Sequence, residues 1–336
     1  MRTLLELPMD VMDIIIGELT VDEKLIFRKT SKSIMSIMDN QESDIKKVAF
    51  YLLHNSTTKL ELVDSNGSKY LWKYEKSNFQ FEKIRKIGDD NCLVSFSFGS
   101  QNETAKFEKV VKNSFPGELL LADFCVVMKN STLVLDKLEM TYLDWDYIGR
   151  FHKKMSKIER KIKVRHLKMD AFGDQQELAV LPYLDIRDTV EITFYADEAH
   201  YKANKETKRI RTLVESEQWA SAKTRRLSAY VQLFPFEVLA DCDHLELELR
   251  MKCLREEQES VQEVLQILLT STVLQRCKIY GNPWNQDIVK EMLSNLGYRQ
   301  CPNDPDFHGR QFSSSEDEKN FTIKVDHVTE IKRNSL

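Results

Sequence analysis

The sequence predicts an α+β protein in three parts, because the spacing of its apolar residues changes twice along the chain. Residues 1–45 show helical spacing, residues 46–115 show the alternation typical of strands, and residues 116–330 contain both patterns in turn. The chain has 336 residues, of which 42% are hydrophobic, so it can bury a sizeable core in more than one domain. We therefore expect an N-terminal helical domain, a β-rich connecting segment and a C-terminal α/β domain.

The N-terminal part is expected to form three short helices. Apolar side chains recur at helical spacing over residues 7–19, and Pro8 suits a first helical turn, where its missing N–H costs nothing. Residues 20–23, with the sequence Thr-Val-Asp-Glu, have the spacing of a capping box and predict the start of a second helix. A third apolar helical face follows over residues 34–38.

These helices carry more apolar surface than they can bury in one another. A segment of this size rarely folds alone without a cross-link or a partner. No cysteine lies within it to form such a cross-link. The surplus apolar surface must therefore pack on the rest of the chain or on another protein.

The stretch resembles an F-box. The first half of that family's pattern, roughly L-P-x-E-I-L-x-x-I-L-x-x-L, falls on residues 7–19. The second half, roughly D-L-x-x-L-R-x-V-C-x-x-L/W, falls on residues 22–34. In that family the three helices dock on a Skp-type adaptor, which is attached to a cullin scaffold in SCF ubiquitin ligases. This sequence departs from the pattern at Asp10, Thr30, Ser31 and Ile34.

The resemblance implies that the apolar stripe binds a Skp-family adaptor and, through it, a cullin. The residues implied to contact the adaptor are Leu7, Pro8, Val11, Met12, Ile15, Ile16, Leu19, Leu25, Phe27 and Ile34. The alternative is an ordinary N-terminal helical hairpin that packs on its own domain. In that case the stripe would be buried within this chain.

The middle segment is expected to form antiparallel β-structure. Residues 59–63 and 70–74 alternate between apolar and polar, and Ser65-Asn66-Gly67 between them is a turn signal. Together they predict a β-hairpin. Further strands are expected at residues 79–81 and 93–98.

The C-terminal segment alternates between helices and short strands, which predicts a parallel sheet. It begins with a helix over residues 117–128. Strands are expected at residues 133–135, 164–169, 190–194, 227–231, 245–249, 277–280 and 321–325. Their irregular spacing overlaps that of leucine-rich repeats, so we expect an irregular leucine-rich-repeat-like α/β module. A doubly wound sheet is the alternative, although no phosphate-binding turn follows any of these strands.

The same segment resembles the FTH domain, which follows the F-box in a large nematode family. The signature of that domain, E-Q-W-K-x-A-K, falls on residues 217–223, with Ala220 in place of the first lysine. A second element, expected to carry a histidine, falls on residues 233–236, where Pro235 replaces that histidine. The resemblance covers roughly residues 130–330.

Trp219 is the most distinctive residue of this signature. Ala222 lies three residues after it, at helical spacing, and Leu213 and Val214 lie shortly before it. An aromatic ring with small and aliphatic neighbours at this spacing is more often core than contact surface. We therefore predict that Trp219 packs between its helix and the sheet.

The sequence predicts no enzyme active site. It contains ten glycines and no G-x-G-x-x-G, Gly-Lys-Ser/Thr or G-x-S-x-G motif. Cys242 and His244 would share one face of a strand, but no second ligand pair lies at zinc spacing, so an alternating strand start is favoured. The polar residues at 197–200 have no nucleophile beside them in the sequence and are expected in a helix start or loop. We therefore expect no catalysis, no cofactor and no metal.

Charge and composition narrow the class of partner. The net charge of −4 gives no general attraction to nucleic acid or to an anionic membrane. No apolar run reaches the roughly 18 residues that span a bilayer. The six cysteines, without C-x-x-C spacing, fit reduced core thiols and predict a cytoplasmic or nuclear protein. A protein partner is therefore expected, rather than a membrane or a nucleic acid.

One basic run departs from this balance of charge. Residues 150–168 are rich in lysine and arginine, and the apolar residues among them predict a single amphipathic helix with a basic exterior. Such a face is usually only solvated, and the alternative is contact with RNA or an acidic partner. No aromatic stacking motif accompanies the run to support RNA. Residues 313–315 are three serines before an acidic stretch, and we expect a polar loop there, with phosphorylation as the alternative.

The two resemblances together imply a substrate-receptor subunit of an SCF-type ubiquitin ligase, which performs no bond chemistry itself. The F-box would bind the adaptor, and the C-terminal domain would capture a protein target that the sequence does not identify. Two alternatives stay open. One is an F-box scaffold or regulatory adaptor that does not cause degradation, and the other is an RNA-binding regulator that uses the basic helix at 150–168.

Overall fold

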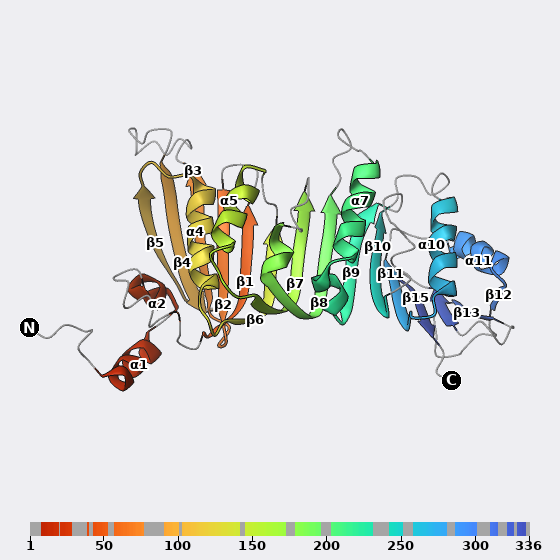
Figure 1. Ribbon diagram of the computed structural model, residues 1–336, viewed down its shortest axis with the longest axis horizontal. Coiled ribbons are helices and arrows are strands. Elements are labelled where there is room, and N and C mark those ends of the chain that lie inside the picture. The colour runs from red at the N-terminus through yellow and green to blue at the C-terminus, as the bar shows by residue number, and fades with distance from the viewer. Residues whose placement is uncertain are drawn as a thin grey trace, which may run out of the picture. The chain divides into compact units, whose positions relative to one another are not determined.

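The computed structural model divides the chain into two compact units, both with helices packed on one face of a sheet (Figure 1). The described residues are 8–19, 21–28, 39, 43–52, 57–76, 91–100, 103–141, 145–172, 179–195, 203–230, 242–250, 258–280, 286–300, 310–314, 321–325 and 328–333. The first unit comprises residues 1–169 and 178–187, and the second comprises residues 170–177 and 188–336. Both units mix helices and strands, in agreement with the mixed composition that the sequence predicts.

Two of the three predicted N-terminal helices lie in the described part of the chain. They are α1 (Met9–Glu18) and α2 (Val21–Arg28). Pro8 precedes α1 with φ −55° and ψ 148°, and its carbonyl accepts the N–H of Met12 at 3.1 Å, which closes the first helical turn. The predicted third helix at 34–38 lies outside the described residues.

The sheet of the first unit contains the β-rich middle segment and continues into the strands after it. Its strands are β1 (Ile45–Leu52), β2 (Thr57–Asp64), β3 (Lys69–Lys76), β4 (Cys92–Ser100), β5 (Glu103–Val111), β6 (Val134–Thr141) and β7 (Ile162–Phe172). They lie in the order β5-β4-β3-β2-β1-β6-β7. Strands β1 to β5 pair in antiparallel fashion, as predicted, whereas β1 and β6 are parallel. The middle segment therefore shares a sheet with the first strand of the C-terminal segment.

The predicted hairpin is confirmed as β2 and β3, which pair in antiparallel register. Gly67 in its turn has φ +80°, a conformation that glycine adopts without steric cost. Side chains of β2 alternate between partly and fully buried, as expected for a strand with one face on the core. The strand expected at residues 79–81 lies outside the described residues.

Two helices, α4 (Pro116–Met128) and α5 (Trp145–Met155), form the helical layer of the first unit. Phe124 of α4 joins this layer to the sheet, since its ring lies 5.1 Å from that of Phe50 and 5.9 Å from that of Phe151. Tyr74 of β3 donates a hydrogen bond to Asp123 of α4 at 2.9 Å. Burial, together with that carboxylate, raises the pKa of Tyr74 well above its usual value. A short 3-10 turn, η2 (Leu181–Tyr183), precedes the next strand.

The basic run at residues 150–168 does not form one helix, so that prediction is wrong. α5 ends at Met155, and β7 begins at Ile162. Ile158 is buried in the turn between them. Within β7, Ile162 is buried and Lys163 is exposed, which is the alternation of a strand. The apolar residues of the run have helical spacing by coincidence, because the last of them belong to a turn and a strand.

The second unit begins with parallel strands that follow one another in chain order, as predicted. The strands are β8 (Leu184–Tyr195), β9 (Thr224–Tyr230), β10 (His244–Arg250) and β11 (Arg276–Tyr280), and each neighbouring pair is parallel. α7 (Ala203–Val214) and α8 (Glu217–Ser221) connect β8 to β9, and α10 (Gln258–Thr270) lies between β10 and β11. In Figure 1, α7 and α10 cover the same face of this sheet. The arrangement fits right-handed crossovers that each return a helix to one face.

The C-terminal end of the second unit is antiparallel, which corrects the parallel order expected from the sequence. After α11 (Gln286–Asn295), the strands are β12 (Tyr298–Gln300), β13 (Arg310–Ser314), β14 (Phe321–Val325) and β15 (Val328–Arg333). All of them pair in antiparallel fashion, and β15 joins β11. Two residues separate β14 from β15, and so short a connection permits only an antiparallel hairpin. Ser313 and Ser314 lie in β13 rather than in the predicted loop.

Trp219 lies in the core of the second unit, as predicted. It is 1% exposed, and Leu213 and Ala222 beside it are also buried. Ser216 caps α8 by accepting the backbone N–H of Trp219 on its hydroxyl at 3.3 Å. The indole Nε1 meets no acceptor among the described residues. Packing rather than a polar contact therefore holds the ring in place.

Replacing Trp219 by alanine should lower the free energy of unfolding by about 3–5 kcal/mol, because the change leaves a large cavity. Trp219→Phe should cost less, since it keeps most of the ring volume and breaks no side-chain hydrogen bond to a described residue. Urea unfolding followed by circular dichroism measures both changes. If the phenylalanine variant is as unstable as the alanine variant, the indole N–H has an essential partner and packing alone does not explain the site.

Candidate protein-interaction surfaces

Among the described side chains of α1 and α2, the large exposed apolar ones lie on α1. Ile14 is 67% exposed and Val11 is 36% exposed, whereas Met12 and Ile16 are each 1% exposed. The stripe predicted from spacing therefore divides into an outward row, Val11 and Ile14, and an inward pair, Met12 and Ile16. Neighbouring apolar side chains left in water are typical of a surface that binds another protein.

The remaining predicted adaptor contacts are spread around these two groups. Pro8 is exposed, while Ile15, Leu19 and Phe27 are partly buried. The predicted contacts outside the described part of the chain are Leu7, the side chain of Leu25, and Ile34. Contact of any of these residues with an adaptor stays a prediction.

Ile14 is absent from the contacts predicted from the sequence, although its side chain is exposed on α1. Residues 14–16 are three consecutive isoleucines. Successive residues of a helix point about 100° apart, so three in a row cannot all face the core. The run itself could have revealed that one isoleucine must face outward.

Hydrogen bonds fix the segment before β1 to the turn after α4. We call the described residues of this segment, the helical residue Asp39 and residues 43–44, the linker. Ser131 donates twice to the carbonyl of Asp39, from its N–H at 2.7 Å and from its hydroxyl at 2.8 Å. The N–H of Ser43 donates to Thr132 Oγ1 at 3.1 Å, and the Thr132 hydroxyl donates to Asn130 Oδ1 at 2.8 Å. These five residues, named here the linker anchor, tie the N-terminal helices to the body of the first unit.

Two charged side chains add contacts to the two segments that the linker anchor joins. Lys24 of α2 forms an ion pair with Asp44 of the linker, with Nζ 3.1 Å from Oδ2. Arg160, in the turn before β7, donates from Nη2 to the carbonyl of Asn130. One contact holds a helix to the linker, and the other holds the turn to which the linker is bound.

Ser131→Ala together with Thr132→Val should speed deuterium exchange at the amide of Ser43, because both side-chain contacts with the linker are lost. Melting temperature should change little, since the altered side chains are exposed. Hydrogen–deuterium exchange mass spectrometry of the full chain measures the effect. Ser156→Ala removes an exposed hydroxyl that bonds only within its own turn, and serves as the matched control. Unchanged exchange over residues 39–45 in the double variant would contradict the anchoring role.

A row of alternating charges crosses the sheet of the second unit. Strand register places Glu191, Arg226, Glu246, Lys278 and Glu330 on neighbouring strands. Glu246 is at its centre, and Arg226 beside it lies with Nη1 2.9 Å from Glu191 and Nε 2.7 Å from Glu246. Lys278 Nζ lies 3.8 Å from Glu246. Arg276 pairs with Glu330 at the end of the row, so positive and negative charges balance. The row therefore stabilises strand pairing rather than forming a site for a charged ligand.

The carboxylate of Glu139 pairs with two lysines on the sheet of the first unit. The ammonium group of Lys47 lies 3.1 Å from its carboxylate, that of Lys137 is also paired with it, and the hydroxyl of Tyr51 donates to it at 3.0 Å. Burial alone would raise the pKa of Glu139, but these three groups lower that pKa to about 2. The carboxylate therefore stabilises the folded state in its charged form.

The stability from Glu139 should be present at neutral pH and lost in acid. Its pKa is lower in the folded chain than in the unfolded chain, so its contribution is complete above about pH 4.3 and falls as the pH drops toward 2. Glu139→Gln should lower the free energy of unfolding by about 1 kcal/mol at pH 7 and flatten its dependence on pH below 4.5. Urea midpoints between pH 7 and 2.5 measure both effects. An equal acid dependence in the two proteins would show that other carboxyls account for it.

Cys242 and His244 lie at the start of β10, on either side of Asp243. No group of three histidine, cysteine, aspartate or glutamate residues that could hold a metal is found among the described residues. Asp243 between them instead joins neighbouring strands, since its carboxylate accepts from Arg225 Nη1 at 2.7 Å and its carbonyl accepts the N–H of Gln275 at 2.8 Å. The polar residues Asp197, Glu198 and His200 lie outside the described part of the chain. In the ranges that are described, no helix has the length and apolar character needed to cross a membrane.

Residues 146–295 match the family model of the FTH domain. The match runs from α5 to the end of α11 and lies within the range over which the sequence resembles that domain. It confirms the FTH domain for these residues and does not extend to α1 and α2. No curated protein matches the chain.

Among solved structures, the chain is similar to a nucleoside-diphosphate sugar epimerase from Corynebacterium glutamicum. The sequence identity is 12% and the TM-score is 0.20, over 70% of this chain and 57% of that one. The chain thus spans little more than half the length of that protein. A TM-score this low supports no conclusion on fold or function.

Proposed function

We propose that this protein is a substrate-receptor subunit of an SCF-type ubiquitin ligase. The observation that carries the proposal is the outward row of α1, in which Val11 and Ile14 are exposed close after Pro8. This helix has apolar surface that the described residues leave exposed, as expected for a segment that binds a partner. The FTH match at residues 146–295 supports the proposal, because that domain follows an F-box in the family that the chain resembles.

In this function the protein performs no bond chemistry. The N-terminal helices bind a Skp-family adaptor and, through it, a cullin, while the FTH domain and the strands beside it bind a protein target in the cytoplasm or nucleus. Ubiquitin transfer is accelerated because the target is held near the charged conjugating enzyme at a high effective concentration. The linker anchor supports this role, since it limits how far the adaptor-binding helices can move from the first unit.

Val11→Ser together with Ile14→Ser should reduce recovery of a Skp-family adaptor by more than about tenfold, because exposed apolar anchors dominate such interfaces. Co-purification of the full chain with the adaptor measures the loss. Val134→Ser together with Val273→Ser is the matched control, since these side chains are 39% and 43% exposed outside the N-terminal helices. The control pair should retain adaptor.

Equal adaptor recovery with both pairs of changes would refute the F-box assignment. Changes to the inward pair, Met12→Ala and Ile16→Ala, should lower the melting temperature, since both side chains are 1% exposed. If the adaptor binds but captured proteins remain stable whether or not the cullin is present, the protein is a scaffold rather than a degradative receptor.

A further inference from the structure

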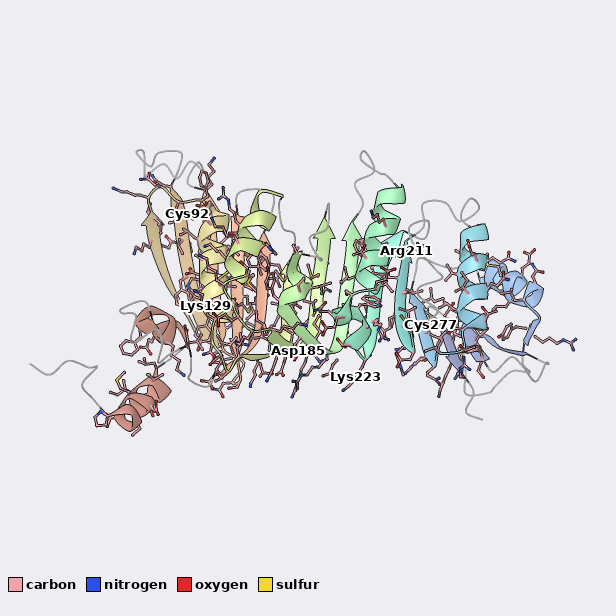
Figure 2. The ribbon with its side chains drawn as sticks, in the orientation of Figure 1. Cys92, Lys129, Asp185, Arg211, Lys223 and Cys277 are labelled. Carbon is pink, nitrogen blue, oxygen red and sulfur yellow. The ribbon has the colours of Figure 1, made fainter. Side chains whose placement is uncertain are left out.

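Four lysines gather where α4 and α5 end in the first unit. Lys129 directly follows α4, Lys153 and Lys154 lie in the last turn of α5, and Lys157 lies in the turn after it. The two helices pack side by side. Lys129 is labelled at the lower end of α4 in Figure 2. We call Lys129, Lys153, Lys154 and Lys157 the lysine surface.

The two helix ends bring these ammonium groups near one point. Burial raises the pKa of the Cys125 thiol, and the charges of Lys154 and Lys129 both act in the opposite direction on it. The two helix ends meet in the structure, because Arg160 in the turn after α5 donates to the carbonyl of Asn130 in the turn after α4. Lys153 and Lys157 extend the surface outward, since both are exposed and lie four positions apart.

The lysine surface is not neutralised by the described residues around it. Its four ammonium groups form no ion pair with any described carboxylate. The arginines nearby are already engaged, because Arg150 pairs with Glu118 and Arg160 donates to the carbonyl groups of Asn130 and Lys161. Among the described residues of this region, the cations without an ion-pair partner are therefore these lysines.

Helix dipoles explain only part of this charge. The C-terminus of a helix carries about half a negative charge, so two adjacent ends account for roughly one lysine. The remaining positive charge has no counterpart among the described residues. A surplus of this kind favours an acidic ligand at the ends of α4 and α5.

We propose that the lysine surface binds an acidic segment of the target protein, rich in aspartate and glutamate. The nearby arginines, which could grip a phosphate with two parallel hydrogen bonds, are already engaged. The lysines act as point charges, which need negative charge in the ligand but no fixed ligand geometry, and a flexible acidic segment supplies that charge. The net charge of −4 opposes general binding of long polyanions. An acidic segment is thus the class of ligand that we assign to this surface. The assignment rests on the proposed receptor function only because it calls the bound protein a target.

The test uses the full chain and a fluorescein-labelled peptide of twelve residues that alternates glutamate with serine. Fluorescence anisotropy should show binding that weakens as salt rises, with no binding of the matching glutamine–serine peptide. Lys129→Gln, Lys153→Gln and Lys157→Gln together should weaken binding by about tenfold or more. The control triple, Lys69→Gln, Lys109→Gln and Lys112→Gln, alters exposed lysines on β3, on β5 and just after β5 and should change affinity by less than about twofold.

Three outcomes would overturn the proposal. Equal losses in the two triple variants would show that only net charge matters. Failure of the wild-type chain to bind the glutamate peptide at low salt would show that no acidic-segment site exists. Tighter binding of a twelve-nucleotide single-stranded RNA, lost in the first triple variant, would assign the surface to nucleic acid instead. The adaptor plays no part in these measurements, so their failure is distinct from failure of the proposed ligase function.

Discussion

The fold depends on satisfying the carbonyl groups where each helix ends and the chain turns toward the next strand. The last four carbonyls of a helix have no partner within it, and leaving one buried and unpaired costs about 1–3 kcal/mol. α11 solves this with Gly297, which has φ +83° and donates to the carbonyl of Ser294. The chain has only ten glycines, and near other helix ends arginines donate to carbonyls of the last helical turn or of the turn that follows it. Arg225 donates to two carbonyls at the end of α8, Arg333 to two after α10, and Arg160 to one after α4.

These arginines also fix where the strands begin. Arg225 is the second residue of β9 and reaches Asp243 just before β10, so one side chain joins a helix end to the starts of two parallel strands. The pairing lowers the pKa of Asp243 despite its partial burial, and the carboxylate stays charged at neutral pH. With strand starts fixed at one edge, register follows along each strand, and the charged row through Arg226 and Glu246 can align across the sheet.

Most strands and helices follow from local periodicity, because the burial of one face is written into every second or every third to fourth residue. Strand direction has no such local signal, so periodicity alone predicts a parallel order for the strand at 321–325. The connection of two residues to β15 decides its direction instead. The prediction of one helix over residues 150–168 is wrong because local spacing is misleading there. Ile158 and Ile162 keep helical spacing, although they lie in a turn and a strand. The linker anchor has no local signal at all, because Asp39 and Ser131 lie 92 positions apart. Ile14, by contrast, could have been found from its two isoleucine neighbours.

The linker anchor lies next to the lysine surface in the first unit. Lys129 of the lysine surface directly precedes Asn130, so the turn that holds the linker is the same turn that presents a cation to a ligand. Effective concentration between two tethered sites falls as the tether lengthens or loosens. A linker fixed by hydrogen bonds at both Asp39 and Ser43 removes much of that loss without any added contact to either partner. In the proposed receptor, adaptor binding on α1 and target binding at the ends of α4 and α5 are therefore coupled through geometry rather than through a conformational change.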